Sequence, residues 1–270
     1  MLLKGAITAL VTPFDGQDRF DENAARRILR QQIEGGIDGV VVGGTTGESP
    51  TIEDAEKQRY TELALEASSG KVPVIVGTGT NSTKSTIAAT QAAKKWGAQA
   101  ALVVCPYYNK PTQEGLYQHF KAVFEASGIP VLAYNVPGRT VTDLLPETIA
   151  RLVEIGAIIG VKDATASMQR AFETLALLPK NKPFSLMSGD DFTILPFVAS
   201  GGAGVISVVS NMVPGDTAEL VRATARGDFD KARALQTKIV MLSRALFATA
   251  NPIPVKVGMN LMGLCAPHLR

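Results

Sequence analysis

The residue best suited to covalent chemistry is Lys162, near the end of the apolar stretch 157–165, Ala-Ile-Ile-Gly-Val-Lys-Asp-Ala-Thr. The length and β-branched content of this stretch predict a buried strand. Burial disfavours the charged form of a lysine, and a neutral amine attacks ketones and aldehydes to give a Schiff base. The alternative is structural: Lys162 marks the solvent end of the strand, or it pairs with Asp163 or another carboxylate, because lysine is rarely buried without a partner.

A glycine-rich turn, Gly-Gly-Thr-Thr-Gly-Glu-Ser, occupies positions 43–49 after the apolar run 39–42. Glycines let a bound anion approach backbone N–H groups closely, and Thr45 and Thr46 add hydroxyl groups. Because the turn lacks the lysine of a phosphate-binding P-loop, we expect a carboxylate rather than a nucleotide. The alternative is a tight turn capped by its own threonines.

Two more reactive side chains follow the apolar run 131–134. The phenol of Tyr134 can serve as general acid and base to an imine, or it can lie in the core with its hydroxyl hydrogen-bonded. Arg139 can bind a substrate carboxylate through two hydrogen bonds, or it can lie on the surface. The residue types alone leave both choices open.

Apolar runs of this kind recur eight times along the 270 residues, separated by helix-like segments. They span 6–11, 39–42, 73–76, 101–104, 131–134, 158–162, 185–187 and 204–209. Strands that alternate with helices predict a parallel sheet, and eight units in this length predict an α/β fold of the (β/α)8 TIM-barrel type. Active sites of such barrels lie at the carboxyl ends of the strands, where the residues above are found.

Helix signals agree with this fold. Asp21, Ser82 and Thr112 are predicted N-caps, Pro146 fits a first helical turn, and residues 51–54 predict a capping box. We expect residues 1–225 to form the catalytic barrel. Residues 226–270 are expected to form a C-terminal helical tail, with helices at 229–247 and 252–264.

Composition narrows the class of protein further. The formal net charge is +2 without runs of like charge, so neither nucleic acid nor an anionic membrane is expected as a partner. No apolar run is long enough to span a bilayer. Two cysteines and two histidines make a disulfide framework and the usual zinc sites unexpected. We therefore expect a cytoplasmic protein without a metal or a cofactor.

Seven motifs, taken together, resemble the dihydrodipicolinate synthase family, also called 4-hydroxy-tetrahydrodipicolinate synthases, within the N-acetylneuraminate lyase superfamily of pyruvate-dependent class I aldolases. They are GGTTGE at 43–48, YYNKP at 107–111, YNVPGR at 134–139, IGVKDAT at 159–165, GDD at 189–191, GVIS at 204–207 and NPIPVK at 251–256. The resemblance runs from about residue 3 to about residue 264. Within the superfamily, the Thr45-Thr46 pair together with Arg139 indicates the synthases.

The resemblance implies a lyase of lysine and diaminopimelate biosynthesis that condenses pyruvate with L-aspartate 4-semialdehyde to 4-hydroxy-tetrahydrodipicolinate. It implies that Lys162 forms an imine with pyruvate and that Thr46 holds the pyruvate carboxylate. It also implies a proton relay of Tyr134, Thr45 and Tyr108, with Tyr108 arriving from a neighbouring subunit. The protein is thus expected to be a homodimer, and a homotetramer as a dimer of such dimers.

The remaining roles concern the walls of the site. The resemblance implies that Arg139 binds the carboxylate of aspartate semialdehyde, and that Gly189 and the backbone of Ile206 shape the pocket. The residues leave two other functions open. The protein could be another pyruvate-dependent aldolase that acts on a sugar acid, or a catalytically silent barrel that only binds.

The sequence departs from the family pattern in two places. Where many members bind inhibitory lysine with a histidine or tryptophan and a glutamate, this chain has Asp54, Lys57 and Ser85. We therefore expect weak or absent inhibition by lysine. Members also usually continue past the position of Arg270 through a further helix, so the C-terminal tail is expected to be short.

Overall fold

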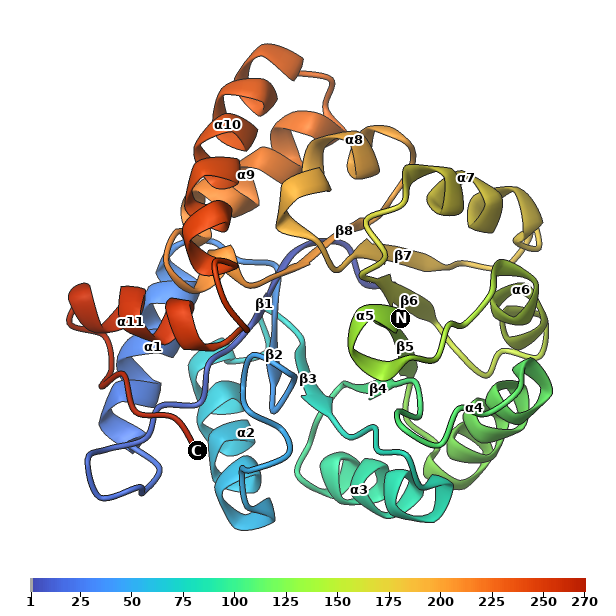
Figure 1. Ribbon diagram of the computed structural model, residues 1–270, viewed down its shortest axis with the longest axis horizontal. Coiled ribbons are helices and arrows are strands. Elements are labelled where there is room, and N and C mark those ends of the chain that lie inside the picture. Colours follow the sequence, from blue (N-terminus) through green and yellow to red (C-terminus); the bar gives the residue numbers. More distant parts are fainter. Residues whose placement is uncertain (1) are drawn as a thin grey trace.

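In the computed structural model of the protein, eight parallel strands form a closed barrel in sequence order, with helices around it (Figure 1). The structure describes residues 2–270. The strands are β1 (Gly5–Ala9), β2 (Gly39–Val42), β3 (Val74–Gly77), β4 (Ala100–Val104), β5 (Val131–Asn135), β6 (Gly160–Asp163), β7 (Ser185–Ser188) and β8 (Gly204–Ser207). β8 pairs with β1 and so closes the sheet. The predicted (β/α)8 fold is confirmed.

Helices surround the barrel, and the short helix that follows β5 lies over the end of the barrel in Figure 1. They are α1 (Glu22–Glu34), α2 (Asp54–Ser68), α3 (Thr83–Lys95), α4 (Gln113–Ser127), α5 (Pro137–Thr140), α6 (Pro146–Glu154), α7 (Met168–Leu177), α8 (Ile194–Ala199), α9 (Pro214–Ala225), α10 (Phe229–Leu246) and α11 (Ile253–Leu261). Two short 3-10 helices, η1 (Asp191–Thr193) and η2 (Val209–Asn211), follow β7 and β8. No helix within residues 2–270 is long and apolar enough to cross a membrane.

Most of the predicted helix starts are confirmed. The side chains of Asp21, Ser82 and Thr112 accept hydrogen bonds from backbone N–H groups in the first turns of α1, α3 and α4. Such a bond pairs one of the amides that a helix start leaves without an intrahelical partner. Pro146 stands at the first position of α6, where its missing N–H costs nothing.

The predicted capping box at residues 51–54 is wrong by two positions. α2 is capped by Glu53, whose N–H donates to the carboxylate of Glu56 over 3.0 Å. Thr51 stands two residues before this N-cap, and its hydroxyl donates to the carbonyl oxygen of Glu48 over 3.1 Å. Thr51 therefore closes the turn that precedes the helix.

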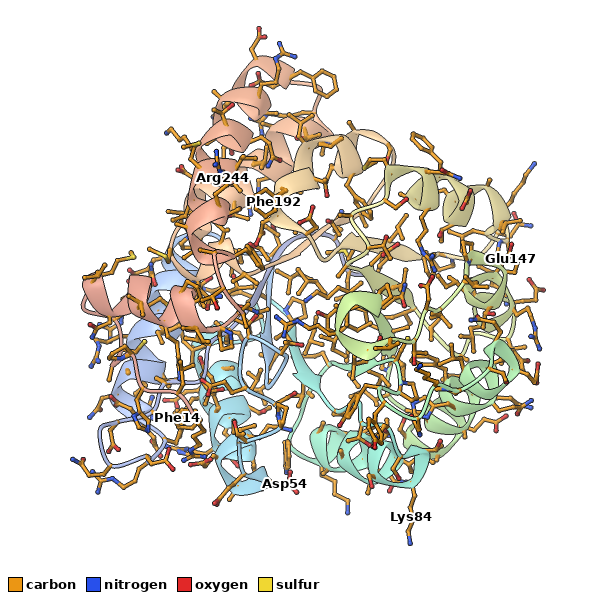
Figure 2. All side chains as sticks on the ribbon, in the orientation of Figure 1. Phe14, Asp54, Lys84, Glu147, Phe192 and Arg244 are labelled. Carbon is orange, nitrogen blue, oxygen red and sulfur yellow. The ribbon has the colours of Figure 1, made fainter. Side chains whose placement is uncertain are left out.

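The strands are buried on both faces, which explains their nearly continuous apolar sequence. Side chains such as Ile7, Val41, Ile75 and Leu132 fill the barrel interior, while a second layer of apolar side chains packs between the strands and the helices. Figure 2 shows how side chains fill the space between the ribbons.

The helices after the eighth unit lie beside the barrel rather than apart from it. α10 packs against α9, and α11 lies near α1 in Figure 1. Buried side chains of both, including Ile239 and Met259, belong to the same apolar cluster as α1 and α2. The predicted division of the chain at residues 225 and 226 stays a prediction.

Candidate active site

Lys162 and Tyr134 face each other on neighbouring strands at one end of the barrel. β5 and β6 pair in a register that sets Tyr134 opposite Lys162. The Nζ atom of Lys162 lies 4.3 Å from the centroid of the Tyr134 ring. Lys162 is 5% exposed, and Tyr134 belongs to the interior apolar cluster of the barrel. The amine thus sits inside the mouth of the barrel against the face of a phenol.

The carboxylate next in sequence points away from this amine. Successive residues of a strand face opposite sides, and Asp163 Oδ2 lies 3.5 Å from Arg170 Nε on α7. Its Oδ1 accepts a hydrogen bond from the Thr165 N–H over 2.8 Å. Burial raises the pKa of Asp163. Lys162 therefore lies neither at a solvent-exposed strand end nor in an ion pair with Asp163.

Gly189, directly after β7, leaves the space that the Lys162 side chain needs. A Cβ atom at this position would lie 3.1 Å from Lys162 Cε and 2.7 Å from Ala164 Cβ. Both distances are shorter than ordinary van der Waals contact. The absence of a side chain at Gly189 thus gives the aliphatic part of Lys162 its place in the site.

The glycine-rich loop 43–49 leaves β2 at the same end of the barrel. Its threonines face different surroundings: Thr46 is buried, whereas Thr45 is half-buried and lines a cavity. The Oγ1 atom of Thr46 accepts a hydrogen bond of 3.0 Å from Asn251 Nδ2. Within the loop, the Glu48 N–H donates to the Thr45 carbonyl oxygen over 3.1 Å. The loop is therefore tied to itself and to the segment before α11.

Arg139 lies on α5 at the opening of the same cavity. The cavity has a volume of about 790 Å³, and Arg139 lines it together with Thr45 and Val136. It continues outward between α2 and α3 as far as Trp96. Arg139 Nη2 donates to the carbonyl oxygen of Asn251 over 3.2 Å. Its guanidinium group is exposed and is thus open to an anionic ligand entering from outside.

The other expected site residues divide into two groups. Ile206 on β8 lies in the interior cluster that contains Tyr134. Tyr108, by contrast, is 87% exposed on the loop after β4 and has a left-handed backbone with φ of 74°. The structure thus brings Lys162, Tyr134 and Gly189 together within one protomer and leaves Tyr108 on the outer surface.

Three side chains around the loop received no role from the sequence. Asn251 contacts both Thr46 and Arg139, and Lys256 forms a buried ion pair with Glu48. The available signal was the motif NPIPVK at 251–256, which places an asparagine and a lysine in an otherwise apolar segment. Within residues 2–270, no three His, Cys, Asp or Glu side chains gather where they could hold a metal ion.

The known proteins that this chain resembles in sequence and in structure include dihydrodipicolinate synthases. Residues 2–270 match the model of the dihydrodipicolinate synthetase family. The 4-hydroxy-tetrahydrodipicolinate synthase of Pelobacter propionicus is 48% identical over 270 residues, which are 100% of this chain and 92% of that protein. The dihydrodipicolinate synthase of Thermotoga maritima superposes with a TM-score of 0.97 at 43% identity, covering 100% and 92% of the two chains.

A second similar structure carries a ligand. It is the dihydrodipicolinate synthase of Acinetobacter baumannii, described as chloride inhibited and complexed with pyruvate. It matches with a TM-score of 0.95 at 41% identity, over 99% of this chain and 91% of that one.

Proposed function

Because this chain belongs to the dihydrodipicolinate synthetase family, we propose that it performs the family's reaction through the amine of Lys162. The reaction condenses pyruvate with L-aspartate 4-semialdehyde to 4-hydroxy-tetrahydrodipicolinate, in lysine and diaminopimelate biosynthesis, and the enzyme is a lyase. The observation that supports the proposed role is the burial of Lys162 without a carboxylate partner, against Tyr134. An amine that is buried in the barrel mouth and not held in an ion pair is placed to attack a ketone.

The first half of the reaction loads pyruvate onto the enzyme. The Lys162 nitrogen attacks the ketone carbon, and loss of water from the resulting carbinolamine leaves a protonated imine. The hydroxyl group of Tyr134, whose ring lies beside Nζ, moves the protons of the amine and of the leaving hydroxyl group. Thr46 and the N–H groups of loop 43–49 hold the pyruvate carboxylate, as hydroxyl and backbone donors around an anion can.

The second half forms the carbon–carbon bond. The imine acidifies the pyruvate methyl group, and loss of a proton gives an enamine. The enamine carbon attacks the aldehyde of aspartate semialdehyde, whose carboxylate binds Arg139 at the opening of the cavity. The amino group of that substrate then displaces Lys162 from the imine carbon, which closes the ring and frees the enzyme. Holding both partners in reacting geometry supplies several kcal/mol.

The relay needs a second copy of the chain. Thr45 lines the cavity, and we propose that it passes protons between Tyr134 and the Tyr108 of a neighbouring protomer. Tyr108 is suited to such an exchange because its side chain projects from the surface. The assembly would be an isologous dimer, in which each Tyr108 reaches the other copy's site, and two such dimers would form a tetramer.

We also propose the cytoplasm as its location. Cys105 and Cys265 are free and buried, which fits a reducing compartment.

Trapping the imine tests the proposal directly. The protein is incubated with pyruvate, reduced with borohydride and digested, and the mass of each lysine-containing peptide is measured. One reduced pyruvate on Lys162 is the expected result. No mass gain would leave the silent barrel, which only binds, as the better interpretation. Supplying aspartate semialdehyde or sugar-acid aldehydes to the loaded enzyme then separates the synthase from a sugar-acid aldolase, and we expect turnover with aspartate semialdehyde.

A further inference from the structure

A buried ion pair involves Glu48 of the glycine-rich loop 43–49. Lys256 Nζ on α11 lies 2.5 Å from Glu48 Oε1, and the two side chains are 0% and 5% exposed. The partners are separated by 208 positions in the chain. The pair therefore joins the helix after the barrel to the loop that carries Thr45 and Thr46.

Both charges have additional partners. Lys256 Nζ donates to the carbonyl oxygen of His268 over 2.6 Å and lies 4.6 Å from the centroid of the Phe14 ring. The second carboxylate oxygen of Glu48 accepts from the N–H of Arg270 over 2.9 Å. Figure 2 shows Phe14 close to the C-terminal end of the chain. The pair is thus buried, and each of its charges has at least one further partner.

Net stability is a weak reason for such a pair. Removing two charges from water costs several kcal/mol per ion, and apolar side chains of similar volume are often as stabilising. A buried pair does fix geometry, because its charge-assisted bonds tolerate little displacement. A role in positioning is therefore the better explanation for Glu48 and Lys256.

The loop backbone shows what the pair would position. Glu48 has a left-handed backbone with φ of 57°, and its N–H and carbonyl groups close turns onto Thr45 and Thr51. Displacing the Glu48 side chain would therefore move the turn that contains both threonines. At the other end of the motif, Asn251 donates to Thr46 Oγ1 and accepts from Arg139.

We propose that the Glu48–Lys256 ion pair is a positioning device that, together with Asn251, holds Thr46 and the backbone of loop 43–49 where they bind the carboxylate of pyruvate. This inference rests on the proposed function, since it takes loop 43–49 as the pyruvate site. Glu48 and Lys256 touch neither substrate and act through Thr46 and the loop backbone. Asn251 additionally links Thr46 to Arg139, so that the two carboxylate-binding positions share one support.

The test measures how imine formation depends on pyruvate concentration. Three variants are compared with the wild type: E48Q, K256M and the double variant E48Q/K256M. We expect the pyruvate concentration for half-maximal trapping at Lys162 to rise about tenfold in each single variant, as for loss of one charge-assisted hydrogen bond. In the double variant, thermal stability should recover because no unpaired buried charge remains, whereas the raised pyruvate requirement should persist.

Coupling to Thr46 separates positioning from a general loss of stability. In a T46A background, adding K256M should change the pyruvate requirement by less than about twofold, because both changes disable the same contact. The matched control is Q32M, which removes a buried side chain bonded to Thr8 and to the Ser210 carbonyl oxygen, outside the site. It should lower the melting temperature without changing pyruvate dependence.

The possible outcomes distinguish this inference from the proposed function. If the wild type forms no trapped imine at Lys162, the proposed function fails. If Lys162 of the wild type is trapped, but K256M and E48Q need the same pyruvate concentration for half-maximal trapping as the wild type, only the positioning inference fails. The inference is also overturned if pyruvate dependence recovers in E48Q/K256M in parallel with stability, because the pair would then act on the fold only.

Discussion

The Nζ atom of Lys162 lies 4.3 Å from the centre of the Tyr134 ring, at paired positions of β5 and β6. This distance places a cation or a neutral amine over the π face rather than in hydrogen-bond contact with a carboxylate. The neighbouring carboxylate of Asp163 faces the other way, toward Arg170. The geometry therefore leaves the amine accessible for reaction.

Replacing Lys162 with alanine should abolish turnover and borohydride trapping with pyruvate. The protein should remain folded, because the replaced amine is not part of an ion pair and most of the barrel core is untouched. We expect the free energy of unfolding to change by no more than about 1 kcal/mol. Activity is measured with both substrates, and stability by denaturant titration.

The matched control is Lys84→Ala, which removes an exposed lysine on α3 (Figure 2) and should keep full trapping. Trapping of K162A at the wild-type level would show that another lysine forms the imine.

Replacing Gly189 with alanine should displace Lys162 while leaving its chemistry intact. The added Cβ would lie 3.1 Å from Lys162 Cε, so the side chain must move. Overpacking of this kind costs about 1 to 3 kcal/mol, and a misplaced nucleophile slows reaction by up to about 100-fold. The rate of imine formation at saturating pyruvate is the quantity to measure. Gly16→Ala is the control, since a Cβ there has no atom within 4 Å; equal rates for both variants would contradict the expected crowding.

The strands and several helix starts could be predicted because their causes are local. Burial on both faces gives continuous apolar runs, and Asp21 or Thr112 caps the helix that follows it directly. The end of β1 was predicted two residues too late, at position 11 instead of Ala9. Val11 is apolar because it is buried after the strand ends, so hydrophobicity alone could not locate that end.

The partners of the loop could not be predicted for a different reason. The hydrogen bond between Asn251 and Thr46 joins residues 205 positions apart. No local pattern contains such a pairing, since it depends on where α11 docks against the finished barrel. The same holds for Lys256, whose position in a helix indicates an ordinary surface lysine until the packing is known.

Lysine should inhibit this protein weakly or not at all. Asp54, Lys57 and Ser85 line the cavity that continues outward from Thr45, and Figure 2 shows Asp54 at the start of α2 beside α3. Burial lowers the pKa of Lys57, and the nearby Asp54 opposes this effect. An ammonium at Lys57 would repel the charged side chain of a bound lysine, by about 1 to 4 kcal/mol at about 4 Å, and Ser85 offers no carboxylate to compensate.

Steady-state rates at increasing lysine concentration check this expectation. Sodium chloride at the same ionic strength serves as the control, because any added salt screens the charges of the enzyme and its substrates and can change the rate. Half-inhibition by sub-millimolar lysine would contradict it.

Acid should destabilise the fold through His119 on α4. This side chain is 5% exposed, its Nδ1 lies 2.9 Å from the Thr83 hydroxyl, and burial lowers its pKa from 6.5 to about 4. The folded protein thus binds fewer protons than the unfolded chain between these values. The resulting stability is fully present above pH 6.5 and is lost as the pH falls through about 4, by about 3 kcal/mol in total.

Denaturant titrations between pH 7 and pH 4 measure this slope. His119→Asn keeps a polar atom near the position of Nδ1 but cannot titrate, so its free energy of unfolding should fall less steeply with acid than that of the wild type. The control is Val123→Ala on the same helix, which removes buried apolar contacts and should lower stability by a similar amount at every pH. If H119N keeps the full wild-type slope, the acid sensitivity arises from carboxylates elsewhere, such as those that must lose their arginine partners when protonated.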